Sequence, residues 1–293
     1  MLITAVGIIS LYIIYKAYQF FKPVTFHNKT VWITGASSGI GEYLAYEFVS
    51  KGAFVILSGR NMQELQRVHE KIPKQSKIII FDLSDANKTL ENANEVCMNN
   101  TIDILINNAG ISQRGLFEEM LDRIDIERKL MEINYFSVIA MSKAYVKNLN
   151  GRKGCIVVVS SLSGLIPAPL RTGYSAAKAG IIGYFESMRS ELKDLGVDVV
   201  NVSPGFVNTN VSINSIDSKG NKANIEDSYN KNGFSPACFA KDVVNSIYRG
   251  ETNVIKAQYS SKLVYLLRSV SPLLALTMVK KFYTKNAKKI VKN

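Results

Sequence analysis

The chain alternates short apolar runs with segments long enough to form helices, from residue 30 to residue 255. The runs are rich in β-branched residues and lack polar alternation, which is typical of strands buried on both faces of a parallel sheet. They lie at residues 31–34, 54–57, 77–81, 104–106, 156–159 and 197–202, with a seventh candidate at 253–255. The pattern predicts an α/β fold built on a doubly wound parallel sheet of about seven strands.

A glycine-rich turn follows the first run and opens a helix-length segment. Glycines let a backbone approach a pyrophosphate closely, and the free amides and positive potential of a helix N-terminus favour an anion. Because a strand precedes the turn and a helix follows it, the turn predicts a dinucleotide site in a Rossmann-type sheet. The predicted cofactor contacts in this turn are Gly35, Ser37, Ser38, Gly39, Ile40 and Gly41.

The end of the second run bears on which dinucleotide is bound. It reads Ser58-Gly59-Arg60. A carboxylate at this point would bond a ribose 2′-hydroxyl and repel a 2′-phosphate, whereas an arginine attracts the phosphate. Arg60 therefore favours NADP(H) over NAD(H), with a merely solvated arginine as the alternative.

Tyr174 and Lys178 are four residues apart in a helix-length segment, so they share one helix face. An ammonium held beside a tyrosine favours the phenolate and lowers the phenol pKa from its usual value near ~10. Such a tyrosine can give or take a proton, and the nearby hydroxyl of Ser161 can hold a carbonyl oxygen. The three residues predict a site that reduces a ketone or oxidises an alcohol beside a hydride carrier.

Composition argues against several other kinds of site. The formal net charge is +12, and residues 262–293 carry eight basic residues and no acid. No base-stacking platform or base-reading motif accompanies this charge, so we expect no nucleic-acid partner. A membrane surface suits a basic tail beside apolar residues, with a solvated tail as the alternative. The three cysteines and two histidines are scattered, which predicts neither a disulfide framework nor a metal site.

The N-terminal 21 residues are almost wholly apolar apart from Lys16, whose side chain can snorkel. About 20 such residues can cross the hydrocarbon layer, and the stretch lacks the basic start and cleavage site of a signal peptide. We therefore expect a single-pass membrane anchor at residues 1–21, with a buried or surface-lying helix as the alternative. Lys16, Lys22 and Lys29 follow the apolar stretch and favour the cytosolic side for the remainder of the chain.

Two further segments lie outside the strand and turn pattern. Residues 210–233 are polar and follow a strand end, where ligands bind in such sheets, so they form either a substrate lid or an idle surface loop. Residues 263–279 are apolar but contain Arg268 and Pro272, which makes them a poor second span. A segment lying on the membrane, or a helix closing the substrate pocket, suits them better. The predicted organisation is an anchor at 1–21, a dinucleotide-binding domain at 28–260 and an apolar, basic segment at 261–293 that associates with membrane.

Taken together, these motifs resemble the short-chain dehydrogenase/reductase family, in order, from residue 29 to residue 249. With the anchor, the chain is most similar to the hydroxysteroid-dehydrogenase-like, endoplasmic-reticulum branch and its dehydrogenase/reductase member seven group. The motifs that carry the resemblance are the glycine turn, Asp82, Asn107-Asn108-Ala109-Gly110, Asn134, Ser161, Tyr174-x-x-x-Lys178 and Pro204-Gly205-Phe206-Val207-Asn208-Thr209.

The resemblance implies roles for the catalytic residues. Tyr174 is expected as the general acid in reduction and the general base in oxidation. Lys178 is expected to lower the Tyr174 pKa and to bond the nicotinamide ribose, and Ser161 to hold the substrate oxygen. Asn134 is expected to anchor a water that links Lys178 to solvent. The further cofactor contacts that the resemblance implies are Asp82, Asn108, Ala109, Gly110, Pro204, Gly205, Val207 and Thr209.

The predicted function is an NADP(H)-dependent oxidoreductase that interconverts a carbonyl and a CH–OH donor in the endoplasmic-reticulum membrane. The anchor favours a lipophilic substrate such as a steroid, retinoid or other lipid, and the other candidate partners are membrane lipid and a second copy in a homodimer. One alternative is a catalytically silent, membrane-tethered NADP-binding protein, although such proteins tend to lose the tyrosine, lysine or glycines present here. Another is a nucleotide-sugar epimerase or dehydratase, a class that is usually longer and spaces its glycines differently.

Overall fold

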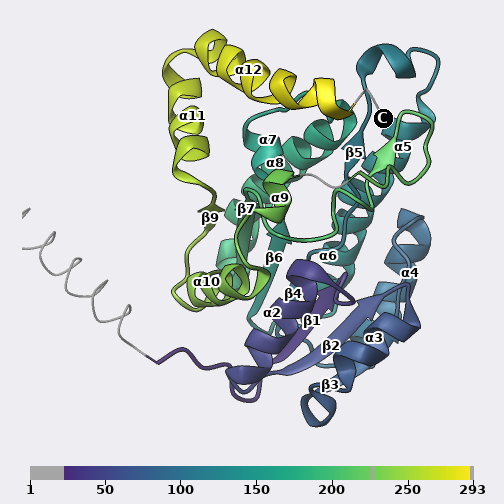
Figure 1. Cartoon of the computed structure of the whole chain (residues 1–293). Coiled ribbons are helices and arrows are strands. Elements are labelled where there is room, and N and C mark those ends of the chain that lie inside the picture. The colour runs from purple at the N-terminus through teal and green to yellow at the C-terminus, as the bar shows by residue number, and fades with distance from the viewer. Residues whose placement is uncertain (1–22, 226–227, 291–293) are drawn as a thin grey trace, which may run out of the picture.

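A seven-stranded parallel sheet forms the centre of the protein in a computed structural model, which describes residues 23–225 and 228–290 (Figure 1). The strand order is β3-β2-β1-β4-β6-β7-β9, and every neighbouring pair is parallel. The sheet confirms the predicted fold class, whereas the expected anchor at 1–21 lies outside the described residues. The strands are β1 (Thr30–Thr34), β2 (Phe54–Gly59), β3 (Ser76–Ile80), β4 (Ile104–Asn107), β6 (Gly154–Val159), β7 (Val197–Pro204) and β9 (Asn253–Lys256).

Burial on both faces explains why the strands read as unbroken apolar runs. Val31, Trp32 and Ile33 of β1 point alternately to opposite faces, yet all three are fully buried. Val31 and Ile33 belong to one core cluster and Trp32 to the other. A central strand covered in this way has no polar face.

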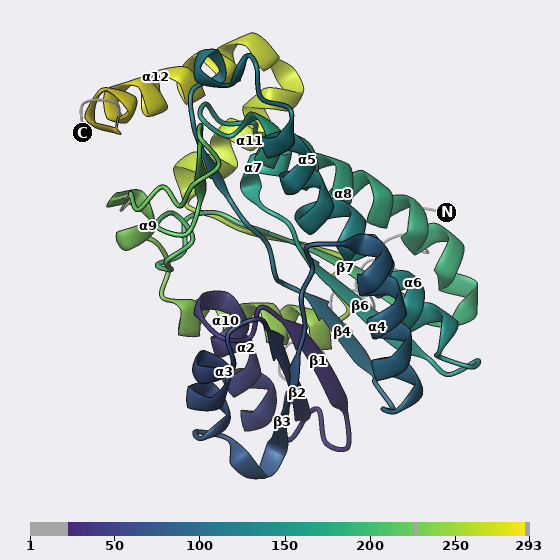
Figure 2. The ribbon, with the colours of Figure 1, turned by 90° about the vertical axis from the view of Figure 1, so that its right-hand side faces the viewer.

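Helices cover both faces of the sheet, as Figure 2 shows edge-on. One face is covered by α2 (Gly39–Ser50), α3 (Met62–His69) and α10 (Pro236–Tyr248). The other is covered mainly by α4 (Ala86–Met98), α6 (Ser137–Lys147) and α8 (Thr172–Leu192). The remaining helices and turns between β2 and β9 are η1 (Pro73–Gln75), η2 (Phe117–Met120), α5 (Asp125–Met131), the π-helical turn η3 (Glu132–Phe136), α7 (Leu162–Leu165), η4 (Lys193–Leu195) and α9 (Ser228–Lys231).

The strand order reverses beside β1. After β1 the chain adds β2 and β3 on one side, then returns to place β4 on the other side. The loops that leave the carboxyl ends of β1 and β4 therefore diverge, and in open parallel sheets this switch point is where a ligand crevice forms.

The described part of the polar segment at 210–233 is hydrogen-bonded to the main body of the protein. It contains β8 (Ile216–Asp217), which pairs in parallel with β5 (Gln113–Arg114) in a separate two-stranded sheet. The Ile216 N–H also donates to the Ser112 carbonyl at 2.9 Å. These bonds tie the segment to the loop after β4.

Two helices end the described chain, α11 (Tyr259–Val270) and α12 (Pro272–Ile290), and both lie near the carboxyl ends of the strands (Figures 1 and 2). The break between them falls at Ser271, directly before Pro272, because proline can begin a helix but cannot continue one. Within residues 23–225 and 228–290, none of the helices has both the length and the apolar character needed to cross a membrane.

Candidate active site

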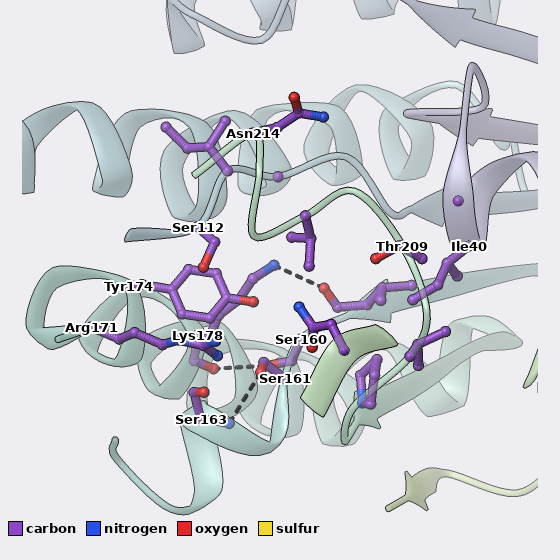
Figure 3. A pocket seen from close by; sticks show the side chains of 18 of the residues that line it. Ile40, Ser112, Ser160, Ser161, Ser163, Arg171, Tyr174, Lys178, Thr209 and Asn214 are labelled. Carbon is purple, nitrogen blue, oxygen red and sulfur yellow. Dashed lines mark hydrogen bonds between the residues drawn. The ribbon is translucent and has the colours of Figure 1, made fainter. Parts of the chain in front are cut away.

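The predicted site residues meet in a cavity of about 890 Å³ at the carboxyl ends of the strands (Figure 3). Gly41 and Asn134 are the two predicted residues that do not line it. The predicted residues that line it are Gly35, Ser37, Ser38, Gly39, Ile40, Arg60, Asp82, Asn108, Ala109, Gly110, Ser161, Tyr174, Lys178, Pro204, Gly205, Val207 and Thr209.

The glycine turn is shaped by backbone conformations that a side chain would resist. Gly35 and Gly39 have φ values of +66° and +57°, in the left-handed region that favours glycine. A Cβ on Gly41 would clash with the Gly35 carbonyl oxygen, so Gly41 lets the first turn of α2 pack against the loop. Gly41 therefore packs against the Gly35 backbone on the side of the turn away from the cavity, whereas its neighbours line the cavity.

An ion pair behind the turn was not predicted from the sequence. The Arg67 guanidinium on α3 donates to both carboxylate oxygens of Glu42 at 2.8 Å, and to the Ser37 carbonyl at 3.2 Å. Burial raises the pKa of Glu42, but hydrogen bonds from Arg67 and Tyr46 outweigh it and hold the pKa below its usual value. Arg67 thus neutralises a carboxylate in the first turn of α2 and fixes the loop that precedes that turn. No local motif marks this pair, because its members are 25 residues apart.

Hydrogen bonds join the loops after β1 and β4. The Thr34 hydroxyl accepts the Asn108 and Ala109 backbone N–H groups, both at 3.1 Å. The Asn108 side-chain amide donates to the Thr34 carbonyl at 2.9 Å and to the Gly35 carbonyl at 3.3 Å. The two loops at the switch point therefore form one unit.

Asn134 lies in the π-helical turn η3 and is fully buried. Its amide nitrogen donates to the Ile111 carbonyl at 2.9 Å, and its carbonyl oxygen accepts the Ile111 N–H at 3.0 Å. It therefore holds Ile111, a residue of the loop after β4 that lines the cavity. A Cβ on Gly110 would lie 2.6 Å from the Asn134 carbonyl oxygen and 3.4 Å from Lys178 Nζ, which leaves room only for glycine there. The expected role of Asn134 in holding a water stays a prediction.

Ser161, Tyr174 and Lys178 converge on one side of the cavity (Figure 3). Ser161 is the N-cap of α7, directly after β6, and its oxygen accepts the Ser163 N–H at 3.1 Å. Tyr174 and Lys178 lie one turn apart on α8, with Lys178 Nζ 5.9 Å from the centre of the Tyr174 ring. Ser161 also hydrogen-bonds the Tyr174 side chain. The Ser160 hydroxyl instead donates to the Lys178 carbonyl at 2.9 Å, so Ser160 fixes α8 against the sheet.

The electrostatics of Tyr174 differ from the expectation. Burial raises the pKa of Tyr174 above its ordinary value, although the Ser161 hydrogen bond and the charges of Arg171 and Arg114 act in the opposite sense. The predicted lowering of this pKa is therefore wrong for the described structure, because the tyrosine is only 9% exposed. Burial also lowers the pKa of Lys178 to about 8, and its ammonium donates to the Val159 carbonyl at 2.9 Å.

Two residues that support Tyr174 were also not predicted. Arg171 is buried, lines the cavity directly before α8 and favours the tyrosinate form through its charge. Gln113 is fully buried, and its side-chain carbonyl accepts the Tyr174 N–H at 3.2 Å. Gln113 thus positions the first turn of α8. Neither residue belongs to a sequence motif with Tyr174, because tertiary contacts, not a fixed spacing, place them beside the tyrosine.

The side of the cavity beyond Tyr174 is lined by the segment at 210–233 and by the two last helices. Of the two interpretations of 210–233, cover of the cavity is the one that the lining residues favour. Residues of 263–279 also line the cavity, as expected of a helix that closes the substrate pocket, and this does not conflict with the alternative of a segment lying on the membrane. The lining side chains from these segments include Val211, Asn214, Ile216, Leu263, Val264, Met278, Val279 and Phe282.

Comparison with known proteins gives consistent matches over most of the chain. A family model described as "short chain dehydrogenase" matches residues 29–220. "Dehydrogenase/reductase SDR family member 7B" of Mus musculus is 31% identical, covering 91% of this chain and 85% of the relative. "Dehydrogenase/reductase SDR family protein 7-like" of Anopheles gambiae is 36% identical, covering 87% of this chain and 83% of the relative.

Solved structures share the fold. A short-chain dehydrogenase from Streptomyces avermitilis is 26% identical with a TM-score of 0.71, covering 88% of this chain and 98% of that one. A short chain dehydrogenase from Burkholderia cenocepacia in complex with NADP also has a TM-score of 0.71, at 21% identity, covering 87% of this chain and 98% of that one. The second likeness concerns the fold alone.

The buried Lys178 predicts a pH-dependent stability. Its pKa of about 8 lies below the ordinary 10.5, so the unfolded chain binds more protons between these values and this group destabilises the folded state at neutral pH. Lys178→Met should therefore raise the free energy of unfolding by on the order of 3 kcal/mol at neutral pH, with the difference from wild type shrinking as the pH rises above 8. Urea unfolding of both proteins across this range measures it. A difference that stays constant with pH would contradict the assignment.

The Arg67–Glu42 pair predicts an asymmetric effect on stability. Arg67→Met removes the bidentate partner of the buried Glu42 carboxylate and leaves only the exposed Lys71 ammonium, 4.0 Å away. It should lower the free energy of unfolding by ~2 kcal/mol, less than for a fully buried pair because Arg67 is partly exposed. The double variant Glu42→Met/Arg67→Met should recover most of this loss, since no buried charge remains and the other partners, Glu64 and Lys71, are exposed. Chemical denaturation of the three proteins tests the prediction. Equal losses in the single and double variants would show that packing, not charge pairing, is what Arg67 provides.

Proposed function

Because the chain belongs to the short-chain dehydrogenase/reductase family, we propose that it is an NADP(H)-dependent oxidoreductase that interconverts a carbonyl and a secondary alcohol by hydride transfer. The observation that carries the proposal is the convergence of Ser161, Tyr174 and Lys178 with the glycine turn in one cavity. The dehydrogenase/reductase class follows from family membership. The assignment of each residue's role is ours.

Tyr174 is the proton donor in the reduction. The hydroxyls of Ser161 and Tyr174 both donate to the substrate carbonyl oxygen, where negative charge develops. NADPH, when bound, supplies the hydride to the carbonyl carbon. The Tyr174 O–H bond breaks, its proton moves to the oxygen, and an alcohol and a tyrosinate result. In the oxidation the same tyrosinate takes the hydroxyl proton back.

The opposite pKa shifts of Tyr174 and Lys178 suit this cycle. A tyrosine with a raised pKa keeps its proton at neutral pH, so it begins the reduction as an acid. The tyrosinate left behind then gains from the Lys178 ammonium near its ring and from the charge of Arg171. Lys178 accordingly stabilises the charged form of the tyrosine, and its pKa of about 8 lets it exchange protons near neutral pH.

The cofactor end of the cavity suits a dinucleotide with a 2′-phosphate. Arg60 lines the cavity at the carboxyl end of β2, and no carboxylate occurs among Ser58, Gly59 and Arg60. The N-terminus of α2 and the left-handed Gly35 and Gly39 form a cradle for the pyrophosphate. Asp82, Asn108 and Ala109 line the region proposed for the adenosine half.

The substrate end suits a lipophilic carbonyl or alcohol. Apolar side chains of α11 and α12, including Leu263, Val264 and Phe282, line the cavity beyond Tyr174. We propose a steroid, retinoid or other lipid as the substrate class and a membrane location for the protein. The apolar composition of residues 1–21 supports the location.

Replacing the proton donor tests the proposed chemistry. Tyr174→Phe should lower turnover of lipophilic carbonyls with NADPH by ~100-fold or more, because general acid catalysis is lost. NADPH binding, followed by nucleotide fluorescence, should change little. Tyr184→Phe on the same helix is the matched control, because Tyr184 does not line the cavity. Full activity of Tyr174→Phe would refute the role.

Reversing the charge at the proposed phosphate contact tests cofactor preference. Arg60→Asp should weaken NADPH binding by about tenfold or more and strengthen NADH binding, since a carboxylate repels a 2′-phosphate and accepts from a 2′-hydroxyl. Arg152→Asp makes the same charge change at an exposed position away from the cavity and serves as the control. Dissociation constants for both nucleotides at fixed ionic strength decide the point. An unchanged NADPH-to-NADH preference would remove Arg60 from the phosphate site.

A further inference from the structure

The outer side of α11 and α12 is apolar and exposed. Val270 and Leu273, on either side of the break between the helices, are 85% and 78% exposed. Leu263 and Leu266 continue the surface along α11, and Leu274 and Leu276 along α12. Met98 and Leu195 stand singly on separate elements, as exposed apolar residues commonly do, whereas Phe117, Leu121 and Ile124 lie together on and after η2. We call the surface formed by α11 and α12 the C-terminal apolar face.

Packing does not explain this surface. None of the twelve residues of α11 is fully buried, and its exposed Leu263, Leu266 and Val270 follow one another at helical spacing. Most of the stability of a short helix comes from burying an apolar face against something else. The C-terminal apolar face therefore requires a partner.

The charge on these helices indicates which partner. From Lys262 to the C-terminus the chain contains eight basic residues and no acid, and Lys262, Lys280 and Lys281 are exposed among the apolar side chains. Two such faces brought together in a dimer would repel one another. A bilayer containing anionic lipid satisfies both properties, because it takes up apolar side chains and attracts lysine and arginine at its surface.

The cavity opens at the same face. Leu263, Met278 and Phe282 are each substantially exposed, and each also lines the cavity. Tyr283, one residue further on, lies close enough to Tyr174 to influence its electrostatics. Figures 1 and 2 show both helices at the end of the molecule where the strands have their carboxyl ends and the cavity lies. A molecule that leaves a membrane beneath these helices would reach the tyrosine without crossing water.

We propose that the C-terminal apolar face docks in the boundary between headgroups and acyl chains of an anionic membrane, and that the cavity opens toward the lipid there. Docking itself does not depend on the enzyme's chemistry. The delivery of lipophilic substrate from the bilayer into the cavity rests on the proposed function.

The depth of individual side chains in the full-length protein tests docking. Val270→Cys and Leu273→Cys, made in a Cys238→Ser background to remove an exposed native thiol, each carry an environment-sensitive fluorophore. On phosphatidylcholine vesicles containing phosphatidylserine, both probes should shift to the blue and be quenched by acyl-chain-brominated lipid. Leu195 is 62% exposed, directly before β7 at the opposite end of the sheet. A probe at Leu195→Cys should neither shift nor be quenched, even if another part of the chain attaches the protein to the same vesicle.

Each outcome bears on the proposal. Probes at Val270 and Leu273 that stay as accessible to aqueous quencher on vesicles as the probe at Leu195 would overturn it. Probes already shielded without vesicles would also overturn it, since another segment of the chain or a second copy would then cover the face. Equal insertion into vesicles of phosphatidylcholine alone would overturn the part assigned to the basic residues.

A second pair of measurements separates docking from catalysis. Val270→Glu/Leu273→Glu alters residues that do not line the cavity, so activity on a water-soluble carbonyl in detergent should stay within about twofold of wild type. With the substrate confined to vesicles, activity should fall by about tenfold or more because a charged side chain opposes insertion. Leu195→Glu is the matched control. If the wild-type protein turns over no carbonyl, the proposed function fails, and the fluorophore measurements still decide docking. If the double variant and the wild type are equally active on vesicle-borne substrate, delivery from the bilayer is overturned.

Discussion

The union of two loops at the switch point is the constraint on which the rest of the site depends. Thr34 accepts both N–H groups at the start of the loop after β4, and the Asn108 amide returns a bond to the Thr34 carbonyl. This link fixes the glycine turn relative to the neighbouring strand, and Asn134 holds the next part of the same loop through Ile111. The loop after β4 therefore contacts both the glycine turn and the region of Lys178 on α8, and fixes their positions relative to one another. Gly110 in this loop leaves space for the Lys178 ammonium.

Burial gives the catalytic pair its character. Taking Tyr174 and Lys178 out of water disfavours the charged form of each, which raises the pKa of the tyrosine and lowers that of the lysine. The spacing of the two residues alone indicates mutual stabilisation of phenolate and ammonium. In the described structure the ammonium bonds the Val159 carbonyl and desolvation outweighs attraction. The tyrosine accordingly starts as an acid, and the surrounding cations matter once its proton has left.

The sequence pattern predicted those elements that depend only on residue type and on neighbours close in sequence. The seven strands follow from apolar runs that require cover on both faces, and the glycine turn follows from backbone angles that only glycine adopts readily. Pairs that are distant in sequence were not predictable in this way. The Arg67–Glu42 pair, the support that Gln113 gives to Tyr174, and the place of Gly41 behind the cradle all arise from packing between elements.

The sequence by itself determined the sheet, the position of the dinucleotide turn and the set of side chains able to manage a proton, because each depends on residue type and short-range spacing. Only the tertiary structure decided the protonation balance of Tyr174, since burial is a property of the assembled core. It also decided that 210–233 and the last two helices line the cavity, among the alternatives that their composition left open. An amphipathic sequence specifies that a helix has an apolar face, but what that face contacts depends on where the rest of the chain places it.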